Sequence, residues 1–158
     1  MQPAIQIVPY EEFGRLHLRS FCPNDNLYSE YVVENSQGHF ITEHIHGVNF
    51  TRWSKRPDDL AVIVIEPDRW ESSGWASNVA PSILSAIGLR LEAGLSLEET
   101  TSRFGTPPRW RSKDGRNVMF HIGGNSPYEV QCHYNPADNM KLNRVVIRRL
   151  DIELPEGE

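Results

Sequence analysis

Two histidines that alternate in one β-rich segment form the pattern in this sequence that most suggests a metal site. His44 and His46 are separated by a single residue. Alternate side chains of a strand point to the same face, so both imidazoles would reach one ion. Imidazole is a common ligand of zinc and other transition metals, and a third ligand would have to come from elsewhere in the chain. The alternative interpretation is a pair of partly exposed strand histidines.

A second pair, His121 and His133, falls in two predicted strands that each have one apolar and one polar side. If these strands form a hairpin, both imidazoles lie on its open face, near Arg144 or Arg148. The complementary polar positions are Asn117, Met119, His121, Glu129, Gln131 and His133. Such a face suits recognition of an acidic or polar partner. Because histidine titrates near neutral pH, a general base is a second interpretation, and plain solvent exposure is a third.

Tryptophans mark two further segments that could bind a partner. Trp70 and Trp75 lie in the irregular segment 66–81, which we interpret as a crossing loop with aromatic anchors. In the segment 109–113, Trp110 stands among three cations, a combination that can contact phosphates and stack a base. The alternative is that Trp110 caps the core under a charged turn.

The two cysteines, Cys22 and Cys132, belong to no Cys-x-x-Cys pair. Cys132 occupies an apolar register position, which favours a small buried residue, and a disulfide between the two is left open. The chain has no Gly-x-Ser-x-Gly elbow, no phosphate-binding glycine loop and no dinucleotide fingerprint. The pattern therefore favours a protein that is not an enzyme and has no cofactor.

The elements that would position these residues are short strands around a helical middle. We predict strands over 5–8, 16–19, 28–34, 39–50, 60–65, 110–112, 117–122, 128–134 and 142–150. The unbroken apolar run of 60–65 is typical of a central strand covered on both faces. The predicted fold class is α+β, with one or two antiparallel sheets and two helices packed on one face.

Those two helices are predicted at about 82–93 and 97–104. Gly94 would end the first helix, which carries an apolar stripe. Ser96, followed three residues later by a glutamate, forms a capping box for the second, and Gly105 stops it.

Length and charge describe an ordinary globular chain. The 158 residues predict one domain, in which a β-rich region (1–66) is followed by a loop and helical region (67–106), a β-meander (107–150) and an acidic tail (151–158). The net charge is −5, which disfavours a nucleic-acid partner. However, residues 107–150 hold 8 basic and 3 acidic groups, whereas residues 1–106 hold 8 and 14. We expect no signal peptide, no membrane span and a cytoplasmic location.

The stretch from Leu95 to Leu150 resembles a known module. Leu95-Ser96-Leu97-Glu98-Glu99 followed by Phe104-Gly105-Thr106-Pro107 is similar to the capped helix of the β-lactamase-inhibitor-like fold, which includes the SmpA/OmlA-type outer-membrane assembly lipoproteins. Thr100 stands where that family usually has an aliphatic residue, and no lipidated cysteine lies near the N-terminus. The resemblance implies a helix packed on an antiparallel meander, with the other sheet face free to bind a protein.

Three hypotheses follow. The favoured one is a non-catalytic, inhibitor- or immunity-like domain that binds another protein through His121, His133, Arg144, Arg148, Trp70 and Trp75. The alternative is a small metal-dependent enzyme that uses His44 and His46. The third is an oligomeric assembly subunit, for which five tyrosines and four tryptophans supply interface anchors. The oligomeric state is left open.

Overall fold

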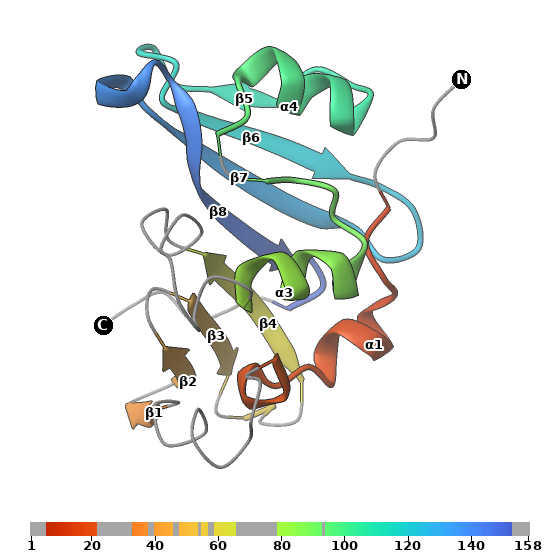
Figure 1. Ribbon diagram of the computed structural model, residues 1–158. Coiled ribbons are helices and arrows are strands. Elements are labelled where there is room, and N and C mark those ends of the chain that lie inside the picture. Colours follow the sequence, from red (N-terminus) through yellow and green to blue (C-terminus); the bar gives the residue numbers. More distant parts are fainter. Residues whose placement is uncertain are drawn as a thin grey trace.

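The computed structural model places the strands of the chain in one antiparallel sheet accompanied by short helices, so the α+β class is confirmed (Figure 1). It describes residues 6–21, 33–37, 40–45, 48–53, 55–56, 59–65, 79–92 and 94–152. The eight strands have the spatial order β1-β2-β3-β4-β8-β7-β6-β5. Their bounds are β1 Val33–Gln37, β2 Phe40–Ile45, β3 Val48–Trp53, β4 Leu60–Ile65, β5 Trp110–Arg111, β6 Asn117–Ile122, β7 Tyr128–Asn135 and β8 Lys141–Arg149.

The pairing of β4 with β8 joins strands β1 to β4 and strands β5 to β8 into a single sheet. Ile63 lies opposite Ile147 in this antiparallel pair, and both side chains are fully buried. The predicted central strand 60–65 is therefore confirmed. The alternative of two separate sheets is wrong for the described strands.

The C-terminal meander follows the sequence prediction closely. Strands β5 to β8 match the four predicted segments within one or two residues at each end. Along β8 the side chains of Leu142, Val145 and Ile147 are buried, whereas Arg144 and Arg148 between or beside them are exposed, as a half-exposed strand requires. Local alternation was sufficient to predict this region of the sheet.

Helix α4, Leu97–Phe104, has the predicted bounds. The Ser96 hydroxyl accepts a hydrogen bond from the Glu99 amide at 3.1 Å, and the Glu99 carboxylate accepts one from the Ser96 amide, also at 3.1 Å. Gly105 ends the helix with a left-handed φ of 72°. Phe104 then stacks on Phe120 of β6, with ring centroids 4.0 Å apart, and this contact fixes the helix to the sheet.

The helix predicted at 82–93 is instead α3, Val79–Ile87. Gly88 adopts a φ of 82°, and the amide of Leu89 donates to the carbonyl of Leu84 at 3.0 Å, which closes a Schellman-type end. The apolar stripe misled the prediction because Leu89 and Leu91 are buried without being helical.

The N-terminal strands predicted at 5–8 and 16–19 are wrong within the described residues. The chain forms α1, Tyr10–Gly14, and a single 3₁₀ turn, η1, Leu18–Phe21. Pro9 precedes α1, and no side chain caps that end. Tertiary contact stabilises this short helix instead. Phe13 is fully buried, and the centroid of its ring lies 5.1 Å from that of Tyr128.

The long strand predicted at 39–50 is two strands, because β2 and β3 pair with each other and Ile45 lies opposite Val48. Upstream, β1 continues to Gln37, three residues beyond the predicted end of the strand at 34. The remainder of the strand predicted at 28–34 lies outside the described residues. Strand propensity alone does not show where a run of β-forming residues reverses direction.

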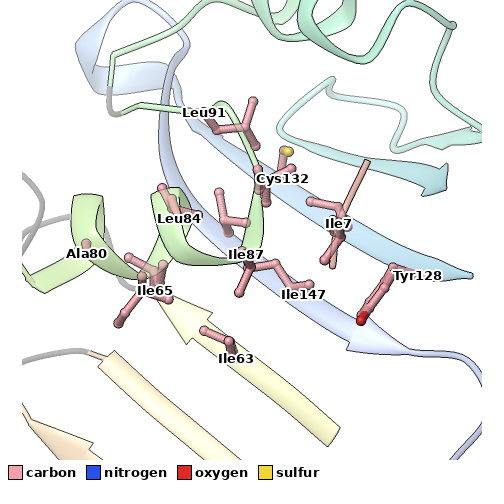
Figure 2. Close-up of a cluster of buried hydrophobic side chains, with 14 of the residues drawn as sticks. Ile7, Ile63, Ile65, Ala80, Leu84, Ile87, Leu91, Tyr128, Cys132 and Ile147 are labelled. Atoms are coloured by element: carbon pink, nitrogen blue, oxygen red, sulfur yellow. The ribbon is translucent and has the colours of Figure 1, made fainter. Parts of the chain in front are cut away.

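One large cluster of buried side chains forms the core. It unites residues from α1, α3 and α4 with alternate residues of β3, β4, β6, β7 and β8. Figure 2 shows Leu84 and Ile87 of α3 directed toward Ile65 and Ile147 of the sheet. A smaller cluster on the other side of β4 and β8 contains Ala61, Val62, Val64, Val146 and Ile152. None of the helices described is long and apolar enough to cross a membrane.

Candidate functional site

The outward side of strands β5 to β8 is the candidate site, and we call it the polar face. Strand alternation assigns its members, since residues that share a register row and alternate along a strand lie on one side of the sheet. They are Trp110, Asn117, Met119, His121, Glu129, Gln131, His133, Arg144, Val146 and Arg148. The positions between them carry core residues, so the same strands supply both stability and this surface.

The register places both predicted histidines beside arginines. His133 lies between Asn117 and Arg144 in one row of three strands. His121 lies opposite Glu129, which in turn lies opposite Arg148. The sequence-based placement of these histidines and arginines on one side of the sheet is therefore confirmed. The two imidazoles occupy different rows, so they do not pair with each other in register.

Trp110 has the most exposed large apolar side chain among the described residues. Its exposed fraction is 52%, so the interpretation that it caps the core is wrong. Met119 lies opposite it on β6, and Gln131 lies opposite Met119 on β7. An open pocket of about 380 Å³ lies at this point, lined by Trp110, Asn117, Val118, Met119 and Gln131. Strand alternation through Met119 is the signal that places Trp110 on the polar face.

Glu129 is the buried carboxylate of the polar face, only 6% exposed. It forms an ion pair with Arg148 and accepts a hydrogen bond from Gln131 Nε2 at 3.1 Å. Burial acts to raise the pKa of Glu129, but the hydrogen bonds from Gln131 and Arg148 outweigh it and hold the pKa below its usual value. The carboxylate is therefore ionised and satisfied near neutral pH, which leaves it poorly suited to act as a base.

His133 is held in place by a neighbouring amide. Its Nδ1 lies 2.9 Å from Asn117 Oδ1, so this ring nitrogen donates and the other nitrogen is an acceptor in the neutral ring. The side-chain Nδ2 of Asn117 and the side-chain Oε1 of Gln131 form no hydrogen bond with the described residues. The pocket at Trp110 thus combines an apolar surface with one hydrogen-bond donor and one acceptor.

Three cations on or beside the edge strand that carries Trp110 form what we call the basic edge. It consists of Arg109, Arg111 and Lys113, which are exposed and form no ion pair within the described segments of the chain. Because Arg111 lies opposite Val118, alternation directs it to the side of the sheet opposite Trp110, and none of the three cations lines the pocket. By contrast, Arg116 is paired with Asp114 in the following turn, at 3.5 Å. The edge therefore contributes positive charge that no described acidic residue neutralises.

The predicted metal pair of His44 and His46 stays a prediction, because only one of the two histidines is described. His44 lies in β2 and His46 lies outside the described residues, as do Trp70 and Trp75. Within the described residues, no group of three or more His, Cys, Asp or Glu side chains is arranged to hold a metal ion.

Cys132 is a core residue and does not belong to the site. Its thiol is free, and Cys22 lies outside the described residues. Burial raises the pKa of the Cys132 thiol to about 12. A thiol that stays protonated at neutral pH is a poor nucleophile.

The buried charges of the core side act in the fold. Arg149, with a side chain 3% exposed, pairs with Asp59 and with Asp151, the latter at 2.6 Å. Arg52 is equally buried and pairs with Glu43 at 2.6 Å. Each arginine has its carboxylate close by, which is the arrangement expected of structural ion pairs.

Comparison of the chain with protein-family models, with curated proteins and with solved structures finds no match. The arrangement itself must therefore carry the functional argument. It offers an exposed indole, an open pocket, oriented carboxamides and a basic edge, which together suit non-covalent recognition.

Proposed function

We propose that this protein is a non-catalytic, inhibitor- or immunity-like domain that binds another protein through its polar face. The observation that carries the proposal is the exposure of Trp110, 52%, beside an open pocket of about 380 Å³. Exposed tryptophans are costly to solvate and are enriched at the centres of protein interfaces. The proposal includes a single domain in the cytoplasm that requires no cofactor.

The proposal assigns the helices to the opposite face of the sheet. Phe104 of α4 stacks on Phe120, and Phe13 of α1 contacts Tyr128, and both of these strand residues point into the core. A helical layer on that side leaves the polar face for a partner. This is also the division of the sheet that a β-lactamase-inhibitor-like module would have.

Binding accounts for the polar residues better than catalysis does. Glu129 is satisfied by Arg148 and Gln131, and His133 is oriented by Asn117. No nucleophile stands beside either group in register, because their neighbours on β6 and β8 are His121, Arg148, Asn117 and Arg144. Glu129 and His133 therefore present a fixed polar surface, and the free side-chain groups of Asn117 and Gln131 can form hydrogen bonds with a partner.

The experiment compares partner capture by matched variants. Immobilised wild type, Trp110→Ala, His133→Ala and the control Glu98→Ala are incubated with lysate of the source cells. Glu98 lies exposed on α4, away from the polar face. We expect one stoichiometric protein to be retained by wild type and control and reduced at least about tenfold by Trp110→Ala.

Circular dichroism of each variant checks that the fold is intact. Equal capture by wild type, Trp110→Ala and His133→Ala would place the partner elsewhere and refute the proposal.

A further inference from the structure

We infer that the polar face binds an uncharged, extended segment of its partner, which lies across the strands and inserts one large apolar side chain at Trp110. This inference rests on the proposed function and adds the chemistry and the direction of the occupant. It is carried by one register row of the sheet, which holds no charged side chain from β5 to β4.

This row, which we call the neutral row, crosses five adjacent strands. Trp110 of β5 lies opposite Met119 of β6, and Met119 lies opposite Gln131 of β7. Gln131 lies opposite Val146 of β8, which in turn lies opposite Val64 of β4. Neighbouring strands are about 4.8 Å apart, so the row extends over roughly 19 Å, the length of about six extended residues. A short linear segment of a partner can therefore span it.

The neutral row is covered at its β4 end and open at its β5 end. Ile152, which follows β8, is only 4% exposed and forms a cluster against which Val64 and Val146 pack. The protein thus places a branched apolar side chain of its own on the outer surface at that end. Trp110 and Met119 at the open end supply an indole and a thioether, which suit one aromatic or branched aliphatic side chain of a partner.

The charged groups beside the neutral row are already engaged within the protein. Glu129 pairs with Arg148 in one neighbouring row, and Arg144 in the other also interacts with a group of the protein. The described residues that line the pocket at Trp110 are all uncharged. A charged ligand side chain would lose hydration there without gaining an opposite charge, which is costly. We therefore expect an uncharged occupant.

Two free side-chain groups define the polar portion of the ligand. Gln131 Nε2 donates to the Glu129 carboxylate at 3.1 Å, which leaves Gln131 Oε1 as a free acceptor. Asn117 Oδ1 is engaged by His133 Nδ1 at 2.9 Å, which leaves Asn117 Nδ2 as a free donor. A peptide group carries one N–H and one C=O. The main chain beside the apolar anchor therefore matches this donor and acceptor.

The short edge strand favours docking across the face over strand addition. Strand β5 has only two residues, and its neighbours Arg109 and Ser112 donate their amides inward, to Met119 and Asn117 of β6. A partner strand added at this edge would gain few main-chain hydrogen bonds. The ligand should therefore be recognised by side chains along the neutral row.

A peptide suits the neutral row better than a nucleic acid does. Single-stranded nucleic acid usually requires a basic groove that follows the backbone, with several aromatic platforms. The row contains no cation to contact phosphates, and Trp110 is its one aromatic side chain. The net charge of the chain, −5, adds to this preference.

The test uses a phage-displayed library of random dodecapeptides, selected on the wild-type protein and counter-selected on Trp110→Ala. We expect Trp110-dependent peptides that share one large apolar residue and are not enriched in acidic or basic residues. A synthetic peptide of this kind should bind at least about tenfold more weakly to Trp110→Ala. Raising the salt from about 50 to about 500 mM should change its affinity by less than about twofold.

Variants within the neutral row sharpen the test. Met119→Lys introduces a charge that the ligand cannot neutralise, and it should weaken the peptide at least about tenfold. The matched control is Ser102→Lys, which adds the same charge at an exposed position of α4 and should leave the affinity unchanged, since α4 packs on the core side of β6. Gln131→Ala removes one acceptor and should weaken the peptide about three- to tenfold. Circular dichroism checks that each variant is folded.

Three results would overturn the inference and leave the proposed function standing. The first is a set of Trp110-dependent peptides that require acidic or basic residues or that bind several-fold more weakly at high salt. The second is unchanged binding of the uncharged peptide to folded Met119→Lys. The third is the absence of any Trp110-dependent peptide although Trp110→Ala loses partner capture, because the partner is then not recognised through one linear segment.

Other contrary results would assign the face to a different occupant. Tighter Trp110-dependent binding of a dodecamer of thymidylate would overturn the inference in favour of nucleic acid. A Trp110-dependent dimer in sedimentation would overturn it by assigning the face to a second copy of this chain. Failure of the inference together with unchanged partner capture by Trp110→Ala would remove the proposed function as well.

Discussion

The two faces of strands β6, β7 and β8 differ sharply in burial and in polarity. On the core face, Val118, Phe120, Val130 and Ile147 are almost completely buried. On the polar face, one residue away in each strand, the side chains are mostly polar and partly or fully exposed. The comparison shows that neighbouring positions in one strand are subject to separate constraints, one for stability and one for recognition.

The largest expected effect is a loss of stability on the core face. Phe120→Ala removes a fully buried ring that stacks on Phe104. We expect it to lower the free energy of unfolding by about 3–5 kcal/mol, since the cavity cannot close completely. The neighbouring change Met119→Ala, on the polar face, should cost less than about 1 kcal/mol. Urea denaturation measures both, and equal losses would contradict the assignment of faces.

Two adjacent arginines provide the second contrast. Arg149→Ala leaves Asp59 and Asp151 without their buried cation and also removes its contact over the ring of Tyr10, at 4.5 Å. We expect a loss of about 2–4 kcal/mol in the free energy of unfolding. Arg148→Ala should cost about 1 kcal/mol or less, because that side chain is 44% exposed. Thermal and urea unfolding of the two variants would show the difference, and the reverse order would refute it.

Acid should remove the contribution that the ionised Glu129 carboxylate makes to the free energy of unfolding. The folded-state pKa of Glu129 lies below its usual value. The ionised carboxylate therefore stabilises the folded protein fully above the unfolded pKa of about 4.3, and this stabilisation is lost as pH falls through the folded pKa. Because Arg148 is partly exposed, the difference between wild type and Glu129→Gln should stay below about 1 kcal/mol at neutral pH.

Urea unfolding across the acid range checks this prediction. The difference in free energy between wild type and Glu129→Gln should vanish in acid, whereas a difference that grows in acid would have the wrong sign.

The smallest expected change in stability belongs to the residue expected to matter most for binding. Trp110→Ala should alter the free energy of unfolding by less than about 0.5 kcal/mol, because the indole is half-exposed on an edge strand. The same variant should lose partner capture. If Trp110→Ala destabilises the protein as strongly as Phe120→Ala, the indole belongs to the core and the comparison of faces fails.

Much of the candidate site could be predicted from alternation alone. The pattern around His121 and His133 predicted a hairpin with both imidazoles on one side, and the observed register agrees. Trp110 was harder to place because a two-residue strand has too little alternation to define a face. Its pairing with Met119 decides the matter, and pairing is a property of the folded sheet.

The sequence alone determined the elements whose signals are local. The capping box of Ser96 and Glu99 defined α4, and alternation defined strands β6 to β8, because these patterns depend on residues a few positions apart. Only the tertiary structure decided that Leu60–Ile65 joins the sheet beside β8. It also decided that α1 forms where Phe13 packs against Tyr128, and that the chain turns at Gly88. These features depend on contacts between distant segments, whose free energy outweighs the weak local propensities of the same residues.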